Sequence, residues 1–117
     1  MAYKRTDRIN ALLRHELQRL IQQEVKDPRV GFATVTGVET SPDLRHARVF
    51  VSVLAGEDEA RAALKALQDA RKYFRHELAQ RTELRYVPDL DFARDTTLEH
   101  ANRIEALLRQ AKEQDRR

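Results

Sequence analysis

Four histidines are the residues whose type best suits acid–base or metal chemistry, and they are spread along the chain. His15 and His76 each precede a glutamate, but neighbouring side chains on a helix point about 100° apart. Neither His46 nor His100 has a second histidine at the spacing of a His-Glu-x-x-His metal site. The sequence therefore predicts neither a catalytic histidine nor a histidine-bound metal.

A second group that could do chemistry is acidic, because Asp89, Asp91 and Asp95 could together surround a cation. Leu90 and Phe92 alternate with the first two acids, so a strand here places the acids on its solvated face. The sequence contains no Walker loop, nucleophile elbow or dinucleotide fingerprint. We therefore expect a protein that is not an enzyme and that holds no metal and no cofactor.

The basic residues within 59–85 offer a different chemistry, which is the binding of phosphate groups. Four apolar residues of this segment share one helical stripe, namely Leu64, Leu67, Phe74 and Leu78. Arg71 stands at the position that the stripe leaves open, and a charge in an apolar seam is costly unless it reaches water. An unbroken helix could let Arg71 snorkel, whereas a break beside Ala70 would turn Arg71, Lys72 and Arg75 outward together. We favour the break.

The distribution of charge points to a polyanion as partner. The chain has 22 Lys and Arg against 19 Asp and Glu, for a net charge of +3. Basic residues outnumber acidic ones in 1–26 and in 61–85, whereas acidic residues dominate 27–60. Separated positive stretches on helices suit a polyanion, although the same residues could simply solvate helix faces. Tyr73 is the one aromatic between these charges that lies outside the apolar stripe, so we expect base stacking to be minor.

Apolar periodicity and turn signals predict an α-β-β-α-α-β-α order. The expected elements are a helix over 6–26, strands over 32–40 and 46–54, two helical segments meeting near 70, a strand over 90–92, and a last helix opened by the capping box of 96–99. The first two strands should pair as an antiparallel hairpin with a bulge or twist at Gly37. This order predicts a two-layer α+β domain, a three-stranded sheet with helices on one face.

Length and composition set the remaining bounds. With 117 residues the chain is expected to form one domain over 1–111, with a charged tail over 112–117 that frays. It has no cysteine, which suits a reducing compartment. It also has no apolar run long enough to span a membrane. We expect a cytoplasmic monomer that does not associate with a membrane.

Six short stretches at the joints of these elements, in this order, resemble the ribosome-binding factor A family of bacterial small-subunit assembly factors. They are Lys26-Asp27-Pro28-Arg29, Thr34-Val35-Thr36-Gly37-Val38, Ser41-Pro42-Asp43-Leu44, Leu84-Arg85, Pro88-Asp89-Leu90-Asp91-Phe92, and Asp95. Each stretch is unspecific alone, but six in order are specific. The resemblance covers the chain from Arg5 to Leu108.

The resemblance implies a type II KH-like fold of order α-β-β-α-kink-α-β-α. KH domains usually grip RNA with a GXXG loop between two helices, but this chain has glycines at positions 31, 37 and 56 alone. The family uses a helix–kink–helix with an Ala-x-Gly signature. Ala70 matches the alanine, Lys72 stands in place of the glycine, and Arg75 matches a basic position after the kink.

The resemblance also implies a partner and a role. The family binds the small (30S) ribosomal subunit and assists late maturation and processing of 16S rRNA, notably in the cold, without being a nuclease. We therefore predict a set of RNA-binding residues, namely Arg71, Lys72, Arg75, Arg81, Arg85, Arg5 and Arg8. The alternative is a module that docks on ribosomal proteins through the edge of the first strand or the acidic segment 57–59. An undetected hydrolase is a third hypothesis.

Overall fold

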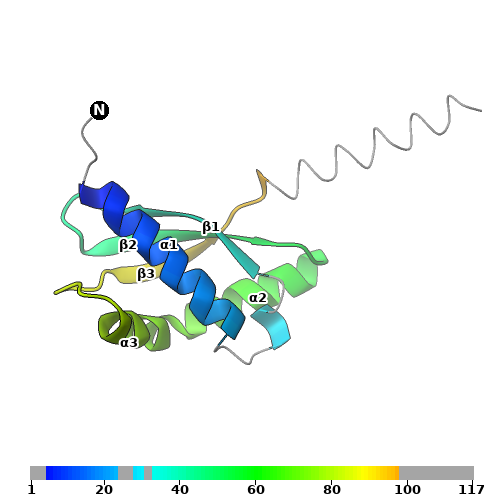
Figure 1. Ribbon diagram of the computed structural model, residues 1–117. Coiled ribbons are helices and arrows are strands. Elements are labelled where there is room, and N and C mark those ends of the chain that lie inside the picture. Colours follow the sequence, from blue (N-terminus) through cyan, green and yellow to red (C-terminus); the bar gives the residue numbers. More distant parts are fainter. Residues whose placement is uncertain (1–4, 24–27, 31–32, 98–117) are drawn as a thin grey trace, which may run out of the picture.

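The computed structural model describes residues 5–23, 28–30 and 33–97 (Figure 1). In chain order these form α1 (Arg5–Gln23), the 3-10 turn η1 (Pro28–Val30), β1 (Ala33–Thr40), β2 (His46–Val53), α2 (Glu57–Asp69), α3 (Arg71–Arg81) and β3 (Asp89–Arg94). The predicted last helix after the 96–99 capping box and the predicted tail over 112–117 lie outside the described residues, so the domain limit at 111 stays a prediction. No described helix is long and apolar enough to cross a bilayer.

The three strands form one mixed sheet in the order β1-β2-β3. β1 and β2 pair antiparallel as the sequence predicts, with Thr40 opposite Ala47 at the turn end. β3 lies parallel to β2 on its other side, beginning with Asp89 opposite His46. The β1–β2 register shifts between Val35 and Gly37, so the bulge lies at the predicted place and Thr36 is its extra residue.

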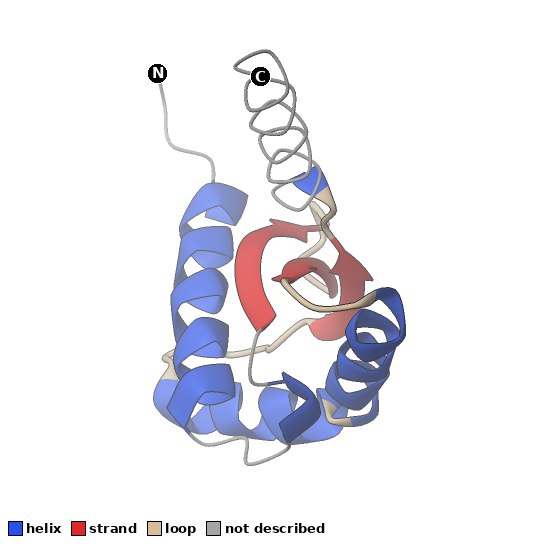
Figure 2. Cartoon of the chain, turned by 90° about the vertical axis from the view of Figure 1, so that its right-hand side faces the viewer, coloured by secondary structure: helices blue, strands red, loops and turns tan. Residues whose placement is uncertain are grey.

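The helices gather on one face of the sheet, where α1, α3 and α2 wrap around the strands in Figure 2. Alternate strand residues such as Val49 and Phe92 are buried against them, whereas Arg48 and Asp91 on the other face are exposed. Residues from α1, α2 and α3 are fully buried in this core, including Leu13, Leu17, Leu67, Phe74 and Leu78. The predicted two-layer α+β architecture is therefore confirmed.

Ala70 separates α2 from α3. Its φ of −91° and ψ of 9° lie outside the helical well, and it both ends one helix and caps the next. The Ala70 N–H donates to the carbonyls of Ala66 and Leu67, each at 3.1 Å, and the Phe74 N–H donates to the Ala70 carbonyl at 3.0 Å. Figures 1 and 2 show the chain changing direction here. As a result, Phe74 still reaches the core although Arg71 stands on the α3 surface.

Candidate nucleic-acid interface

The first turn of α3 places three predicted cations around one hollow. Arg71 and Lys72 are exposed, and Arg75 lies one turn further along the helix on the same side. Together with Asp89 and Leu90 of β3 they line a hollow of about 280 Å³. Neither Arg71 nor Lys72 forms an ion pair with another residue in the described part of the chain. Their charges are therefore directed to solvent, as a phosphate-binding surface requires.

Arg75 is held by three groups of its own chain. Its Nη1 lies 2.9 Å from Oδ1 of Asp89, and its Nε donates to the Val87 carbonyl at 3.0 Å. Its guanidinium also lies over the Tyr86 ring, 5.3 Å from the centroid. Because Asp89 balances its charge, Arg75 braces the segment before β3 against α3. Its predicted contact with phosphate stays a prediction.

A second hollow, of about 470 Å³, lies between α3 and the segment that leads to β3. Its lining residues are Lys72, Arg75, His76, Ala79, Leu84, Arg85, Tyr86 and Val87. The exposed Arg85 therefore lies beside the cations of α3, and its predicted contact with RNA stays a prediction. Tyr86 is 50% exposed and was not predicted as a site residue, because its segment has no periodicity that places a ring. We call the Arg71–Lys72–Arg85 cluster the basic ridge.

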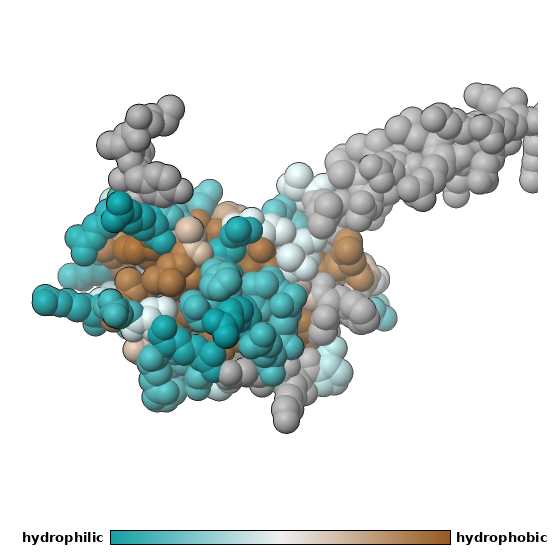
Figure 3. Space-filling view, in the orientation of Figure 1, coloured by the Kyte–Doolittle hydropathy of each residue, from teal (hydrophilic) through white to brown (hydrophobic). Residues whose placement is uncertain are grey.

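Three further predicted cations, Arg81, Arg5 and Arg8, lie apart from the two hollows that the basic ridge lines. Arg81 is on the last turn of α3, where its Nε lies 3.3 Å from Oε2 of Glu77, in the i,i+4 arrangement of a surface pair. Arg5 and Arg8 are exposed on the first two turns of α1 and line neither hollow. Figure 3 shows hydrophilic side chains over α3 on this face of the molecule.

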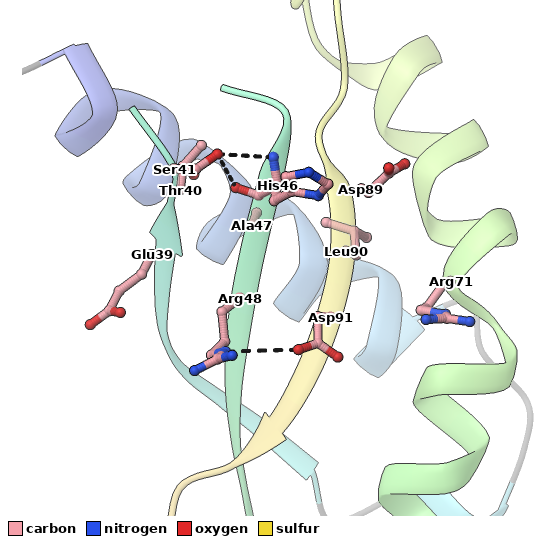
Figure 4. A pocket seen from close by; sticks show the side chains of 10 residues that line it. All are labelled: Glu39, Thr40, Ser41, His46, Ala47, Arg48, Arg71, Asp89, Leu90 and Asp91. Carbon is pink, nitrogen blue, oxygen red and sulfur yellow. Dashed lines mark hydrogen bonds and ion pairs between the residues drawn. The ribbon is translucent and has the colours of Figure 1, made fainter. Parts of the chain in front are cut away.

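Arg71 also borders a wider hollow of about 570 Å³ over the ends of the strands (Figure 4). Its remaining lining includes Glu39, Asp89 and Asp91 from the strands, and Arg48 lies 3.7 Å from Asp91. Asp89 and Asp91 are paired with Arg75 and Arg48, so the strands add little net positive charge on this side. The positive surface therefore extends from Arg71 along α3 toward Arg85, and does not continue onto the sheet.

The three acids considered as cation ligands are each engaged separately. Asp89 pairs with Arg75, Asp91 faces Arg48, and Asp95 accepts a hydrogen bond from the Thr36 hydroxyl at 2.7 Å. Within the described residues no group of three or more His, Asp or Glu side chains is placed to hold a metal ion. The arrangement offers binding chemistry through charge, without an assembled acid–base or metal centre in that part of the chain.

Two carboxyl groups outside the basic ridge have shifted pKa values. The pKa of Asp95 is lowered mainly by the hydrogen bond from the Thr36 hydroxyl and then by the Thr97 N–H. The pKa of Asp43 is lowered by the Ser41 hydroxyl and then by the Arg45 N–H within the β1–β2 turn. Both shifts follow from hydrogen bonds to the ionised form. They belong to turn and sheet geometry rather than to a reactive site.

The two-layer α+β fold with its broken helix pair agrees with the KH-like class expected from the sequence, although the sequence lacks the GXXG loop of usual KH domains. The family model for ribosome-binding factor A matches residues 5–108, and the chain belongs to this family. The chain is 46% identical over 113 residues to ribosome-binding factor A of Thermomicrobium roseum, covering 97% of this chain and 88% of the relative.

Two sets of coordinates from Thermus thermophilus support the same assignment. The crystal structure of ribosome-binding factor A from this organism matches with a TM-score of 0.69 and 32% identity, covering 79% of this chain and 97% of that one. A homology model of the T. thermophilus factor, fitted into a cryo-EM map of a 30S complex, matches with a TM-score of 0.63 and 32% identity. That match covers 74% of this chain and 90% of the other. The KH-like fold predicted from the sequence is therefore confirmed.

Proposed function

We propose that this protein binds the small (30S) ribosomal subunit in the cytoplasm by direct contact with 16S rRNA, and assists late rRNA maturation and processing without catalysing a reaction. The observation that carries the proposal is the exposed Arg71–Lys72 pair beside the helix break, continued by Arg85. The fitted 30S complex of the T. thermophilus relative supports the choice of partner.

Electrostatics explain how this surface would grip RNA. Each Lys or Arg that neutralises a phosphate releases counterions, so the logarithm of the binding constant falls linearly with the logarithm of the salt concentration. We call the steepness of this fall the salt slope, and each phosphate contact adds about 0.7 to 0.9 to it. Arg71 and Lys72 have no carboxylate partner among the described residues, so their full charge is available. Arg75 contributes less to this slope, because Asp89 already compensates it.

The test is co-sedimentation with 30S subunits across a salt series. We expect the double variant Arg71→Ala with Lys72→Ala to bind more weakly and to lower the salt slope by about 1.5. The matched control is Arg61→Ala with Lys65→Ala, which removes the same charge from exposed α2 positions paired with Glu57 and Asp69. Equal effects of the two double variants would place the RNA contact elsewhere.

The alternative, docking on ribosomal proteins through the β1 edge, has less support. On that edge the Val35 N–H donates to Oε1 of Gln18 at 2.6 Å, and the Thr40 N–H donates to Oδ1 of Asn10 at 2.9 Å. These two amides already donate hydrogen bonds to side chains of α1, so they are not free to pair with an added strand. Pull-downs from nuclease-treated extract separate the two cases, because a contact with protein alone survives removal of RNA.

A further inference from the structure

We propose that the hollow between α3 and the segment leading to β3 is a stacking site for one unpaired RNA base, with the Tyr86 ring as its platform. The inference rests on the proposed function and deepens it, because it specifies single-stranded RNA as the ligand of this hollow. It also revises the expectation that stacking is minor, which was based on Tyr73 alone.

The Tyr86 ring is contacted by Arg75, while the residue as a whole stays 50% exposed. The Arg75 guanidinium lies over the ring at 5.3 Å from the centroid, and Arg75 is itself fixed by Asp89 and by the Val87 carbonyl. The next two residues, Val87 and Pro88, are buried and anchor the backbone. A ring positioned in advance loses little conformational freedom when a ligand binds, which favours affinity.

The rest of the lining suits the other parts of a nucleotide. Lys72 and Arg85 supply positive charge for a phosphate, whereas Leu84, Ala79 and Val87 supply apolar surface beside the ring. A hollow of about 470 Å³ lies within the usual range of about 300 to 1,000 Å³ for small-ligand sites. An aromatic ring with flanking cations is the combination that binds single-stranded nucleic acid. A base inside a duplex cannot offer its face, so the base must be unpaired.

The test uses the absence of tryptophan from the sequence. The variant Tyr86→Trp places the chain's single tryptophan on the proposed platform, where it can be excited apart from the remaining tyrosines, and base stacking should quench it. The probe is a single-stranded RNA of about eight nucleotides, which is within the usual footprint of such sites. We expect saturable quenching by this RNA, and little quenching by its duplex or by an abasic strand of the same length. Tyr73→Trp, on α3 but outside the hollow, should respond weakly to all three.

Affinity gives an independent readout. We expect Tyr86→Ala to bind the single strand about tenfold more weakly with an unchanged salt slope, and Tyr86→Phe to bind like the wild type. Circular dichroism establishes that each variant is folded. If Tyr86→Ala binds normally while Arg71→Ala with Lys72→Ala does not, stacking is overturned and the proposed function stands. Equal quenching by the abasic strand would also overturn stacking. If the wild type binds neither RNA nor 30S subunits, both proposals fall.

Discussion

Arg75 of α3 and Asp89 of β3 form an ion pair that joins the two elements, with Nη1 2.9 Å from Oδ1. The same arginine donates from Nε to the carbonyl of Val87, two residues before Asp89. The pair thus sets the position of Tyr86 and of the hollow that Tyr86 lines. A residue predicted to contact phosphate therefore has a second role, which is to hold that surface together.

A double-mutant cycle on Arg75 and Asp89 measures this brace. Because the two side chains are 41% and 56% exposed, solvent screening limits the coupling energy to about 0.5 kcal/mol. Arg75→Ala alone should cost more, about 1 kcal/mol, because the Val87 carbonyl also loses its donor. Urea unfolding gives these values. The control cycle is Arg48 with Asp91, a looser pair at 3.7 Å, where we expect coupling near zero. A larger coupling in the control pair would contradict this account of the brace.

The hydrogen bond between Thr36 and Asp95 predicts a pH-dependent contribution to stability. Thr36 is the extra residue of the bulge, and its hydroxyl lies 2.7 Å from Oδ2 of Asp95 just after β3. This contact lowers the pKa of Asp95 below 3.8 in the folded state. The stabilising contribution is therefore complete above the unfolded pKa and is lost as the pH falls through the folded pKa.

Thr36→Val removes the hydroxyl while keeping the shape of the side chain. We expect it to lower the urea midpoint at about pH 7, and to differ less from the wild type as the pH falls through the lowered pKa of Asp95. Asp95→Asn should show the same reduced pH response. Ser41→Ala is the comparison, because it removes the corresponding donor from Asp43 within the turn and leaves the bulge intact. A Thr36→Val difference that is constant with pH would rule out the linkage to Asp95.

Gln68 of α2 occupies the open edge of β3. Its Oε1 accepts from the Phe92 N–H at 3.0 Å, and its Nε2 donates to Oδ1 of Asp91 at 2.9 Å. Gln68→Ala leaves the Phe92 amide without this partner, so we expect a loss of about 1 to 2 kcal/mol in the free energy of unfolding. Hydrogen exchange at Phe92 should also become faster. Gln80→Ala, on an exposed face of α3, should change stability by less than about 0.5 kcal/mol. Equal losses would show that Gln68 matters only as a helix residue.

Features that depend on nearby residues in the chain could be predicted from the sequence. Contacts between residues that are distant in the sequence could not. Arg71 interrupts an apolar stripe, so the break at Ala70 and the outward cations could be read from periodicity. Arg75 looked equivalent to Arg71, because nothing local indicates that Asp89, fourteen residues later, neutralises it. Tyr86 lies in a segment without periodicity, so its place beside α3 emerges only once β3 is set parallel to β2.

Lys72 provides the last prediction, because the family resemblance places glycine at this position. The break does not depend on residue 72, since the non-helical backbone angles belong to Ala70 and their negative φ does not require glycine. Lys72 is the second residue of α3 and already helical. Lys72→Gly should therefore leave the break in place and destabilise the protein by about 0.5 to 1 kcal/mol relative to Lys72→Ala.

Both substitutions at Lys72 remove the same charge, so both should lower the salt slope for 30S binding by about 0.7 to 0.9. Comparing the two variants separates the effect of charge from that of the backbone, because they lose the same charge but glycine has a much lower helix propensity than alanine. Thermal unfolding measures the change in stability that comes from the backbone. Co-sedimentation across a salt series measures the effect of the lost charge. If Lys72→Gly bound 30S subunits more tightly than Lys72→Ala, a sharper bend would matter more than the lost cation. RNA binding would then depend on close contact between the protein backbone and the RNA, as in KH domains that carry the GXXG loop.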